Sequence, residues 1–270
     1  MEILGIDIGA SGIKGAPVNT ETGVLTGARY RLPTPESAKP GPMIELMGKI
    51  IHHFKWSGAI GCGYPGVVIN GITLSAANVH QKWVGLNAAA LIAEKTDCPV
   101  CIVNDADAAG LAEMKFGAGR GHMGVVLIVT IGTGLGTALF TNGHLLPNAE
   151  LGHIELGGED AERSASDAAR KRGRLSWKKW GRQFNRYLQE LEKLLSPNLI
   201  ILGGGSSKRF SEFSQYLTVR AEIVPAQLLN DAGIVGAALA AQDCMNGEGA
   251  GMTTPPAHPE FGRDEVSQDV

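Results

Sequence analysis

The chain has 270 residues, of which 44% are hydrophobic and 19% charged, which is typical of a soluble globular protein with one large domain or two small ones. Its formal net charge of −3 gives no indication of a nucleic-acid partner. The apolar run at residues 3–8 is interrupted by Asp7 and is too short for a signal peptide, and no stretch approaches the ~18 apolar residues of a membrane span. We therefore expect a cytoplasmic protein with no nucleic-acid partner and no membrane partner.

The four cysteines do not form a metal-binding pattern. Cys98 and Cys101 make a C-x-x-C, but no second Cys/His pair follows at the spacing of zinc ligands. Cys101 also falls inside an apolar strand. We expect Cys62, Cys98, Cys101 and Cys244 to be reduced thiols, buried as small apolar side chains are.

Residues 2–16 predict two strands joined by a glycine-rich turn, D-I-G-A-S-G. Gly9 and Gly12 permit positive φ and would expose backbone N–H groups to an anion. Asp7 is a candidate for water-mediated contact with Mg²⁺, and Lys14 for contact with phosphate. The sequence is not a Walker loop, and the turn alone is equally consistent with a simple tight hairpin.

The next segments predict a helix at 43–54, a strand at 59–68 and a helix at 86–96. The strand ends in a Gly-Pro turn, where the absence of a side chain at Gly66 would let a ligand approach the backbone. Asn78 follows in a polar loop. It is either part of a sugar pocket or a surface loop residue.

Residues 100–109 combine a buried strand with the strongest catalytic candidate. Four apolar residues lead directly into Asn104 and Asp105. A carboxylate at the end of a buried strand is partly desolvated, which raises its pKa toward that of a general base. Asn104 offers both a donor and an acceptor to a polyhydroxylated ligand. The alternative is a helix N-cap, which explains one of these polar residues but not the whole run N-D-x-D.

Residues 124–140 repeat the opening plan of apolar strand, glycine-rich turn and apolar strand. The turn runs from Gly132 to Gly136 and carries Thr133. Two such hairpins in one chain predict a duplicated core that clamps a phosphate chain between its halves. Further along, residues 198–208 predict a strand followed by three glycines, Gly203, Gly204 and Gly205, which suits a nucleotide lying against the backbone or a tight connection alone.

Residues 150–158 and 163–186 add polar candidates. Glu150 and His153 follow a turn and would bind adjacent hydroxyls of a sugar, although a lone histidine is more often solvated. The second segment is strongly basic, which indicates either a solvated helix face or a groove for an extended polyanion. The candidates for that groove are Lys171, Arg174, Lys178, Arg182 and Arg186.

Taken in order, the motifs D-I-G-x-S-x-x-K, G-x-P-G, N-D-A-D-A-A, I-G-T-G-x-G, E-x-G-H and L-G-G-G resemble those of the ROK sugar kinases over residues 3–241. Within that family the chain is most similar to the polyphosphate glucokinases, including the polyphosphate/ATP glucomannokinases. The resemblance implies an α/β protein with the actin-like ATPase and sugar kinase fold, in which two α/β domains with mixed sheets surround a cleft. We expect a small domain at 1–106, with a helix at 231–243 packing back on it, a large domain at 107–230 and a disordered tail at 244–270.

The resemblance also implies roles for individual residues. Asp105 would be the catalytic base that takes the proton from the sugar 6-hydroxyl. The residues expected to bind the sugar are Gly66, Asn78, Asn104, Asp105, Glu150, His153 and Glu162. The residues expected to bind phosphate or nucleotide are Asp7, Gly9, Ser11, Gly12, Lys14, Gly132, Thr133, Gly134, Gly136, Gly203, Gly204 and Gly205.

The implied reaction transfers the terminal phosphoryl group of inorganic polyphosphate, and of ATP, to glucose, with Mg²⁺ near Asp7 and a homodimer as the assembly. Zinc is not expected, because the cysteine cluster that typical family members carry after E-x-G-H is absent. An ATP-dependent ROK hexokinase acting on glucose or mannose without polyphosphate is the alternative. We expect neither a sugar-binding repressor, since the first strand begins at residue 3, nor a sugar-free ATPase, which would not need E-x-G-H.

Overall fold

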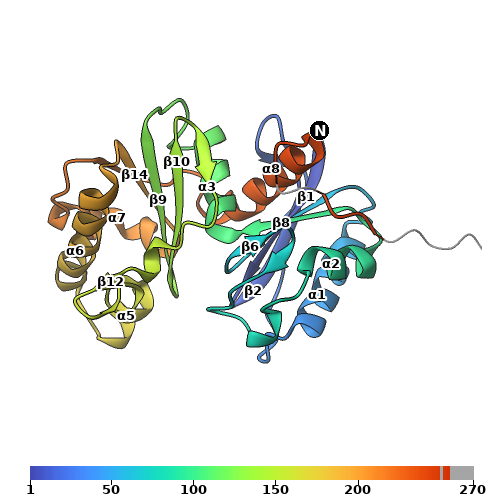
Figure 1. Ribbon diagram of the computed structural model, residues 1–270, viewed down its shortest axis with the longest axis horizontal. Helices are drawn as coiled ribbons and strands as arrows, with labels where there is room; N and C mark the ends of the chain where they lie inside the picture. The colour runs from blue at the N-terminus through green and yellow to red at the C-terminus, as the bar shows by residue number, and fades with distance from the viewer. Residues whose placement is uncertain (250–251, 256–270) are drawn as a thin grey trace, which may run out of the picture.

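Two hairpins of apolar strands form the centres of two mixed sheets. The computed structural model describes residues 1–249 and 252–255, and places the two sheets in two lobes (Figure 1). The first sheet has the order β3-β2-β1-β5-β8, with β4 beside β2; β1 is antiparallel to β2 and parallel to β5. Its strands are β1 (Glu2–Gly9), β2 (Gly12–Asn19), β3 (Val24–Leu25), β4 (Tyr30–Leu32), β5 (Ile60–Tyr64) and β8 (Val100–Asn104).

The second sheet repeats this plan. It has the order β11-β10-β9-β14-β15, with β9 antiparallel to β10 and parallel to β14. Its strands are β9 (Val125–Ile131), β10 (Leu135–Thr141), β11 (His144–Leu146), β14 (Leu199–Gly203) and β15 (Glu222–Pro225). Two short pairs complete the strands: β6 (Val68–Ile69) with β7 (Ile72–Thr73), and β12 (Glu155–Leu156) with β13 (Glu159–Asp160).

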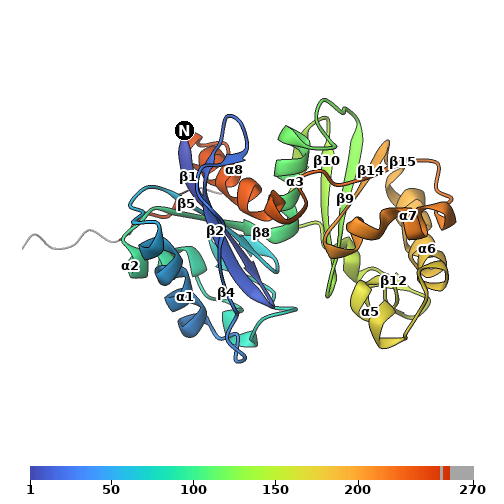
Figure 2. The same cartoon turned by 180° about the vertical axis from the view of Figure 1, so that it is seen from behind.

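Helices cover both faces of each sheet. On the first, α1 (Pro40–His53) and α2 (Ala88–Thr96) bury one apolar face, and α8 (Ala232–Asn246) covers the other, as Figure 2 shows from behind. On the second, α6 (Trp177–Leu195) buries Trp180, Phe184 and Leu188 against the strands. The smaller helices beside it are α4 (Glu162–Ala165), α5 (Asp167–Arg172) and α7 (Phe210–Phe213). Single 3₁₀ turns lie at Gln81–Trp83, Leu151–His153, Gly205–Arg209, Ser214–Tyr216 and Leu229–Asp231.

Helix α3 (Asp105–Phe116) lies between the lobes and contacts both α8 and β10. Small residues make these contacts close. A methyl group at Gly236 of α8 would overlap the carbonyl oxygen of Ala108, and one at Gly110 of α3 would collide with Ala138 and Phe140. Because α3 is wedged between the lobes in this way, its first residue, Asp105, is held where the two sheets face each other.

The cysteines differ from the expectation of reduced thiols at two of the four positions. The structure joins Cys101 of β8 to Cys244 of α8 as a disulfide, while Cys62 and Cys98 are free and buried. The partners are 143 residues apart in sequence. The pairing depends on the packing of α8 against β8, which the spacing of cysteines along the chain does not reveal.

The end of the chain also differs in detail from the expected tail at 244–270. Helix α8 continues to Asn246, and Thr253 forms an isolated bridge with Val100 of β8. The rest of that expected tail, residues 250–251 and 256–270, lies outside the described residues. Within residues 1–249 and 252–255, no helix is long and apolar enough to cross a membrane.

Candidate active site

Two cavities meet between the lobes, and Asp105 lines both of them. The first, of about 250 Å³, is lined by the Gly-Pro turn after β5, the start of α3, the glycine turn after β9 and the loop that follows β11. The second, of about 230 Å³, lies beside β1, β14 and the start of α8. Thr130 and Gly204 also line both cavities. The arrangement places one carboxylate at the junction of two separate binding spaces.

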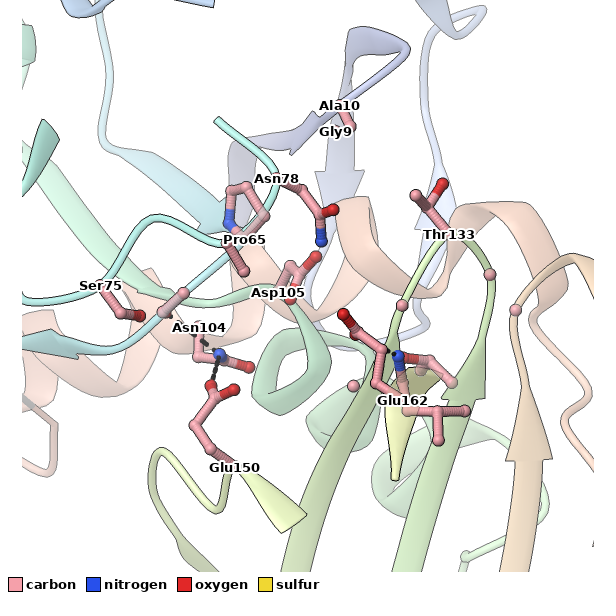
Figure 3. Close-up of a pocket in the computed structure, with 18 of the residues that line it drawn as sticks. Gly9, Ala10, Pro65, Ser75, Asn78, Asn104, Asp105, Thr133, Glu150 and Glu162 are labelled. Carbon is pink, nitrogen blue, oxygen red and sulfur yellow. Dashed lines mark hydrogen bonds between the residues drawn. The ribbon is translucent and has the colours of Figure 1, made fainter. Parts of the chain in front are cut away.

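Asp105 is the first residue of α3, directly after the buried strand β8. In Figure 3 its side chain projects into the first cavity, between Asn78 and Glu162. Burial and the nearby charges of Asp7, Glu150 and Asp107 together raise the pKa of this carboxyl to about 8, although the hydrogen bond from the Ala106 N–H lowers it. A carboxyl group with such a pKa accepts a proton readily near neutral pH.

Asn104 combines the two roles that the sequence left open. Its Oδ1 accepts hydrogen bonds from the N–H groups of Ala106 (2.8 Å) and Asp107 (3.0 Å) and so caps α3. Its Nδ2 donates to the carbonyl oxygen of Gly66 (3.1 Å) and to Glu150 Oε1 (2.9 Å), the bond drawn in Figure 3. The buried amide therefore fixes the start of α3, the wall at Gly66 and the Glu150 carboxylate together.

Glu150 is held from both sides by buried groups of its neighbours. The N–H of Asn148 donates to Asp107 Oδ2 (2.7 Å), and the N–H of Leu151 donates to the Thr137 hydroxyl (2.9 Å). Burial raises the pKa of Glu150, and His153 and Asn104 oppose that shift. The backbone around Glu150 is therefore fixed, and the carboxylate oxygens of Glu150 face the first cavity.

His153 and Glu162 complete the polar lining. His153 Nε2 lies 3.8 Å from Glu150 Oε2, and its Nδ1 lies 2.8 Å from Asp160 Oδ2. Glu162, the first residue of α4, accepts a hydrogen bond from the N–H of Leu135 at Oε2 (3.0 Å). A methyl group at Gly134 would lie 2.1 Å from that same oxygen, so the glycine makes room for the carboxylate. Three side chains rich in acceptors thus surround one small cavity, as recognition of several hydroxyl groups requires.

The second cavity carries the charged residues that we expected near phosphate. Lys14 Nζ lies 2.9 Å from Asp7 Oδ2 and also donates to the carbonyl oxygen of Asn230 (2.9 Å). Gly203, Gly204 and Gly205 line the same space. Gly204 has φ of 76°, and a Cβ there would lie 2.5 Å from the carbonyl oxygen of Ile131, so no other residue fits without strain.

No group of three His, Cys, Asp or Glu side chains that would hold a metal ion exists among residues 1–249 and 252–255. Magnesium does not need such a cage, because it usually keeps several waters and binds one or two carboxylates together with substrate phosphates. Asp7, which lines the second cavity with Asp105, has a carboxylate that could serve as such a magnesium ligand. The residues present therefore fit a water-mediated Mg²⁺ ion.

The structure brings together most, but not all, of the predicted site residues. The first cavity includes Gly9, Gly66, Asn78, Asn104, Asp105, Gly132, Thr133, Gly134, Gly136, Glu150, His153 and Glu162. The second includes Asp7, Lys14 and the three glycines at the end of β14, Gly203, Gly204 and Gly205. Ser11 and Gly12 line neither cavity; the Ser11 carbonyl oxygen accepts a hydrogen bond from Arg31 (2.6 Å) instead.

The proposed polyphosphate groove also lies outside both cavities. All five of its predicted residues are exposed, on or between α5 and α6. Lys171 is paired with Asp167 at 2.8 Å. Arg170, in the same basic run, lies over the ring of Trp177 and pairs with Asp167 as well.

Several contributors were not predicted. Thr130 lines both cavities, and Asn230 receives the Lys14 ammonium. A polar residue at the end of the apolar run V-V-L-I-V was a signal for Thr130. Asp160, which contacts His153, is the half-buried last residue of the short strand β13 and has no motif that marks it.

Comparisons with known proteins place the chain in a family. The family model described as "ROK family" matches residues 3–168. The polyphosphate glucokinase of Mycobacterium tuberculosis is 45% identical over 237 residues, which are 87% of this chain and 89% of that protein. The crystal structure of the inorganic polyphosphate/ATP-glucomannokinase from Arthrobacter sp. strain KM is 45% identical, with a TM-score of 0.86 over 88% of this chain and 97% of that one.

A more distant structure agrees in fold. The ROK family glucokinase from Streptomyces griseus, solved with glucose and AMPPNP, is 24% identical, with a TM-score of 0.78 over 90% of this chain and all of that one. The predicted fold, two α/β units of the actin-like ATPase type around a cleft, is therefore confirmed. On the match to the family model and the identity to these relatives, the chain belongs to the ROK family.

Proposed function

We propose that this protein is a polyphosphate-dependent glucokinase, which transfers the terminal phosphoryl group of inorganic polyphosphate to the 6-hydroxyl of glucose. The observation that carries the proposal is the position of Asp105 at the junction of an acceptor-rich cavity and a cavity with a lysine and three glycines. The 45% identity to proteins named polyphosphate glucokinase and polyphosphate/ATP-glucomannokinase, over nearly nine-tenths of the chain, supports it.

In the proposed reaction the sugar occupies the first cavity. Glu150, His153, Glu162 and Asn78 bind its hydroxyl groups, and the backbone at Gly66 forms one wall. Asp105 accepts the proton of the 6-hydroxyl as the oxygen attacks phosphorus, an effect worth roughly 10²–10⁴-fold in rate. Positioning and charge neutralisation supply most of the remaining acceleration in phosphoryl transfer.

The donor phosphates occupy the second cavity in this proposal. Lys14 and the glycine backbone at 203–205 contact them, and the start of α8 closes the far side. Asp7 would hold a Mg²⁺ ion through water, and the ion would supply neutralisation of phosphate charge. Closure of the two lobes would exclude water, which otherwise competes with the sugar hydroxyl for the phosphoryl group.

The choice of donor rests on the basic surface of α5 and α6. We propose that Lys171, Arg174, Lys178, Arg182 and Arg186 bind the remainder of a polyphosphate chain, because clustered cations attract a polyanion. ATP is the second donor, since the triple glycine at the end of β14 lines a space open to a nucleotide. We further propose a homodimer and a cytoplasmic location, where the intracellular polyphosphate and ATP pools lie.

The test is a coupled assay of glucose 6-phosphate formation with Mg²⁺ and glucose, comparing polyphosphate with ATP. Activity with polyphosphate supports the proposal. Activity with ATP alone would replace it by an ATP-dependent ROK hexokinase and reduce the basic surface to a solvated face. Absence of activity with either donor would contradict glucose as the acceptor, and mannose would then be the next sugar to assay.

A further inference from the structure

A carboxylate behind the sugar cavity connects two of the residues that line it. Asp160 ends the hairpin formed by β12 and β13 and does not itself line the cavity. Its Oδ2 lies 2.8 Å from His153 Nδ1, and its Oδ1 accepts the N–H of Glu162 (3.0 Å). The Asp160 side chain therefore contacts both the ring of His153 and the backbone N–H of Glu162, the first residue of α4.

We propose that Asp160 is a positioning residue for sugar binding, which fixes the tautomer and orientation of His153 and the placement of Glu162. The inference rests on the proposed function, because it assumes that these two residues bind the sugar. Neither the family resemblance nor the motif E-x-G-H assigns a role to Asp160.

The chemistry of the contact explains why a carboxylate is needed. An ionised carboxylate only accepts hydrogen bonds, so the proton of a neutral imidazole must sit on Nδ1. Nε2 is then an acceptor and faces Glu150 and the cavity. A sugar hydroxyl that lies between His153 and Glu150 can donate its hydrogen bond either to Nε2 of His153 or to the Glu150 carboxylate. An amide at position 160 could present its NH₂ group to Nδ1 and thereby reverse the tautomer.

The charge of Asp160 also acts on the ring, and it favours the protonated form of His153, in which both ring nitrogens donate. Burial lowers the pKa of His153, but the hydrogen bond and charge of Asp160, with the charges of Glu162 and Glu150, outweigh it and raise the pKa. These three carboxylates are the ionisable groups that act on the ring among the described residues. Asp160 alone of the three contacts the ring within hydrogen-bond distance.

The hairpin itself does not depend on this side chain. Glu155 pairs with Asp160 and Leu156 with Glu159 through backbone bonds, and the N–H of Ala161 donates to the carbonyl oxygen of Ile154 (2.9 Å). Substitution of the Asp160 side chain therefore removes the contacts to His153 and Glu162 and leaves the backbone pairing in place. Glu159, exposed on the same hairpin, provides a matched control.

The experiment compares Asp160→Asn and Asp160→Ala with the control Glu159→Gln in the full chain. Loss of a hydrogen bond to a charged group corresponds to roughly a tenfold to hundredfold change in an equilibrium. We expect the KM for glucose to rise by about that factor in both variants, in Asp160→Ala because the contact is lost and in Asp160→Asn because the tautomer is reversed. The KM for polyphosphate and kcat at saturating glucose should stay close to wild type, and Glu159→Gln should match wild type throughout.

A second measurement does not require activity. The ring ¹⁵N shifts of His153, assigned with a His153→Gln variant, report tautomer and pKa directly. We expect Nδ1 to be protonated in the wild type, and the pKa of His153 to fall in both Asp160 variants. The proposal would be overturned if the ¹⁵N shifts of His153 were the same in the Asp160 variants as in the wild type. It would also be overturned if these variants lowered kcat and raised both KM values by the same factor. If the wild type phosphorylates no sugar, the proposed function fails, while the His153 shifts still decide whether Asp160 sets the tautomer.

Discussion

The two glycine turns share a plan and differ in what surrounds them. The turn between β1 and β2 lies beside Asp7 and Lys14, and a side chain from outside the hairpin, Arg31, reaches the Ser11 carbonyl oxygen. The turn between β9 and β10 is instead covered by a carboxylate, because Glu162 accepts the N–H of Leu135. A backbone N–H already bonded to a carboxylate does not serve a phosphate in this arrangement.

We propose that this difference gives the two turns different partners. From the sequence we expected both turns to contact phosphate, because two such hairpins predict a duplicated core that clamps a phosphate chain between its halves. Gly9 of the first turn and Gly134 of the second both line the first cavity, but the second turn supports Glu162 through the Leu135 N–H, whereas the charged pair of Asp7 and Lys14 lies beside the first hairpin. The two hairpins therefore share a backbone plan but differ in the side chains around their turns, and Asp105 lies between the two hairpins.

The largest effect should follow from changing the residue that both sides share. Asp105→Ala removes the only carboxylate that lines both cavities among the described residues, so we expect kcat to fall by about 10²–10⁴-fold with polyphosphate and with ATP. Glucose binding, followed by calorimetry without a donor, should persist. A variant that keeps wild-type kcat with either donor would show that another group accepts the proton.

A matched pair of glycine substitutions tests the two turns directly. In Gly134→Ala the new methyl group would lie 2.1 Å from Glu162 Oε2, so the carboxylate must leave the Leu135 N–H. In Gly12→Ala the methyl group meets the end of the flexible Arg31 side chain at 2.5 Å, which can move away. We expect the KM for glucose to rise by roughly tenfold in Gly134→Ala and to change little in Gly12→Ala. Equal changes in the two variants would contradict the division of roles.

The same comparison shows what the sequence could reveal. Asn78, Asp105, Glu150 and His153 lie in one cavity because each follows a strand or a turn at the edge where the sheets face each other, and strand ends and turns are visible as patterns.

Other features depend on distances between segments that no local pattern encodes. Asp160 reaches His153 through a two-residue turn at Gly157 and Gly158, without any periodicity to predict it. The disulfide between Cys101 and Cys244 follows from the packing of α8 on β8. Asn104 was described as either a cap or a ligand-binding residue, whereas its amide caps α3 and holds Glu150 at once.

The donor side can be tested through surface charge. Reversal of Lys178, Arg182 and Arg186 to glutamate changes exposed residues of α6 that line neither cavity. If polyphosphate lies there, its KM should rise several-fold and more steeply at low salt, because the interaction is electrostatic and screened. The KM for ATP should not change.

A control for this variant reverses Lys49, Lys82 and Lys95, which are exposed on the other lobe and give the same change in net charge. Long-range effects of net charge would appear in both variants. Equal losses with polyphosphate in the two triple variants, or equal losses with polyphosphate and ATP, would exclude a polyphosphate groove on α6.

The last expected effect concerns stability, and it follows from the position of Asp105 between the two halves. The pKa of its carboxyl is raised by burial and by Asp7, Glu150 and Asp107 from 3.8 to about 8 in the folded protein. The folded state therefore binds more protons than the unfolded state between these pH values, so the stability contribution of the neutral carboxyl is lost as pH rises through that window. Asp105→Asn removes this titration, and its Tm should exceed that of the wild type by an amount that grows from pH 4 to pH 8. Over the same range the kcat/KM of the wild type should increase as Asp105 ionises. A difference in Tm that is independent of pH would mean that Asp105 is ionised throughout, and the carboxylate would then orient the sugar hydroxyl without accepting its proton.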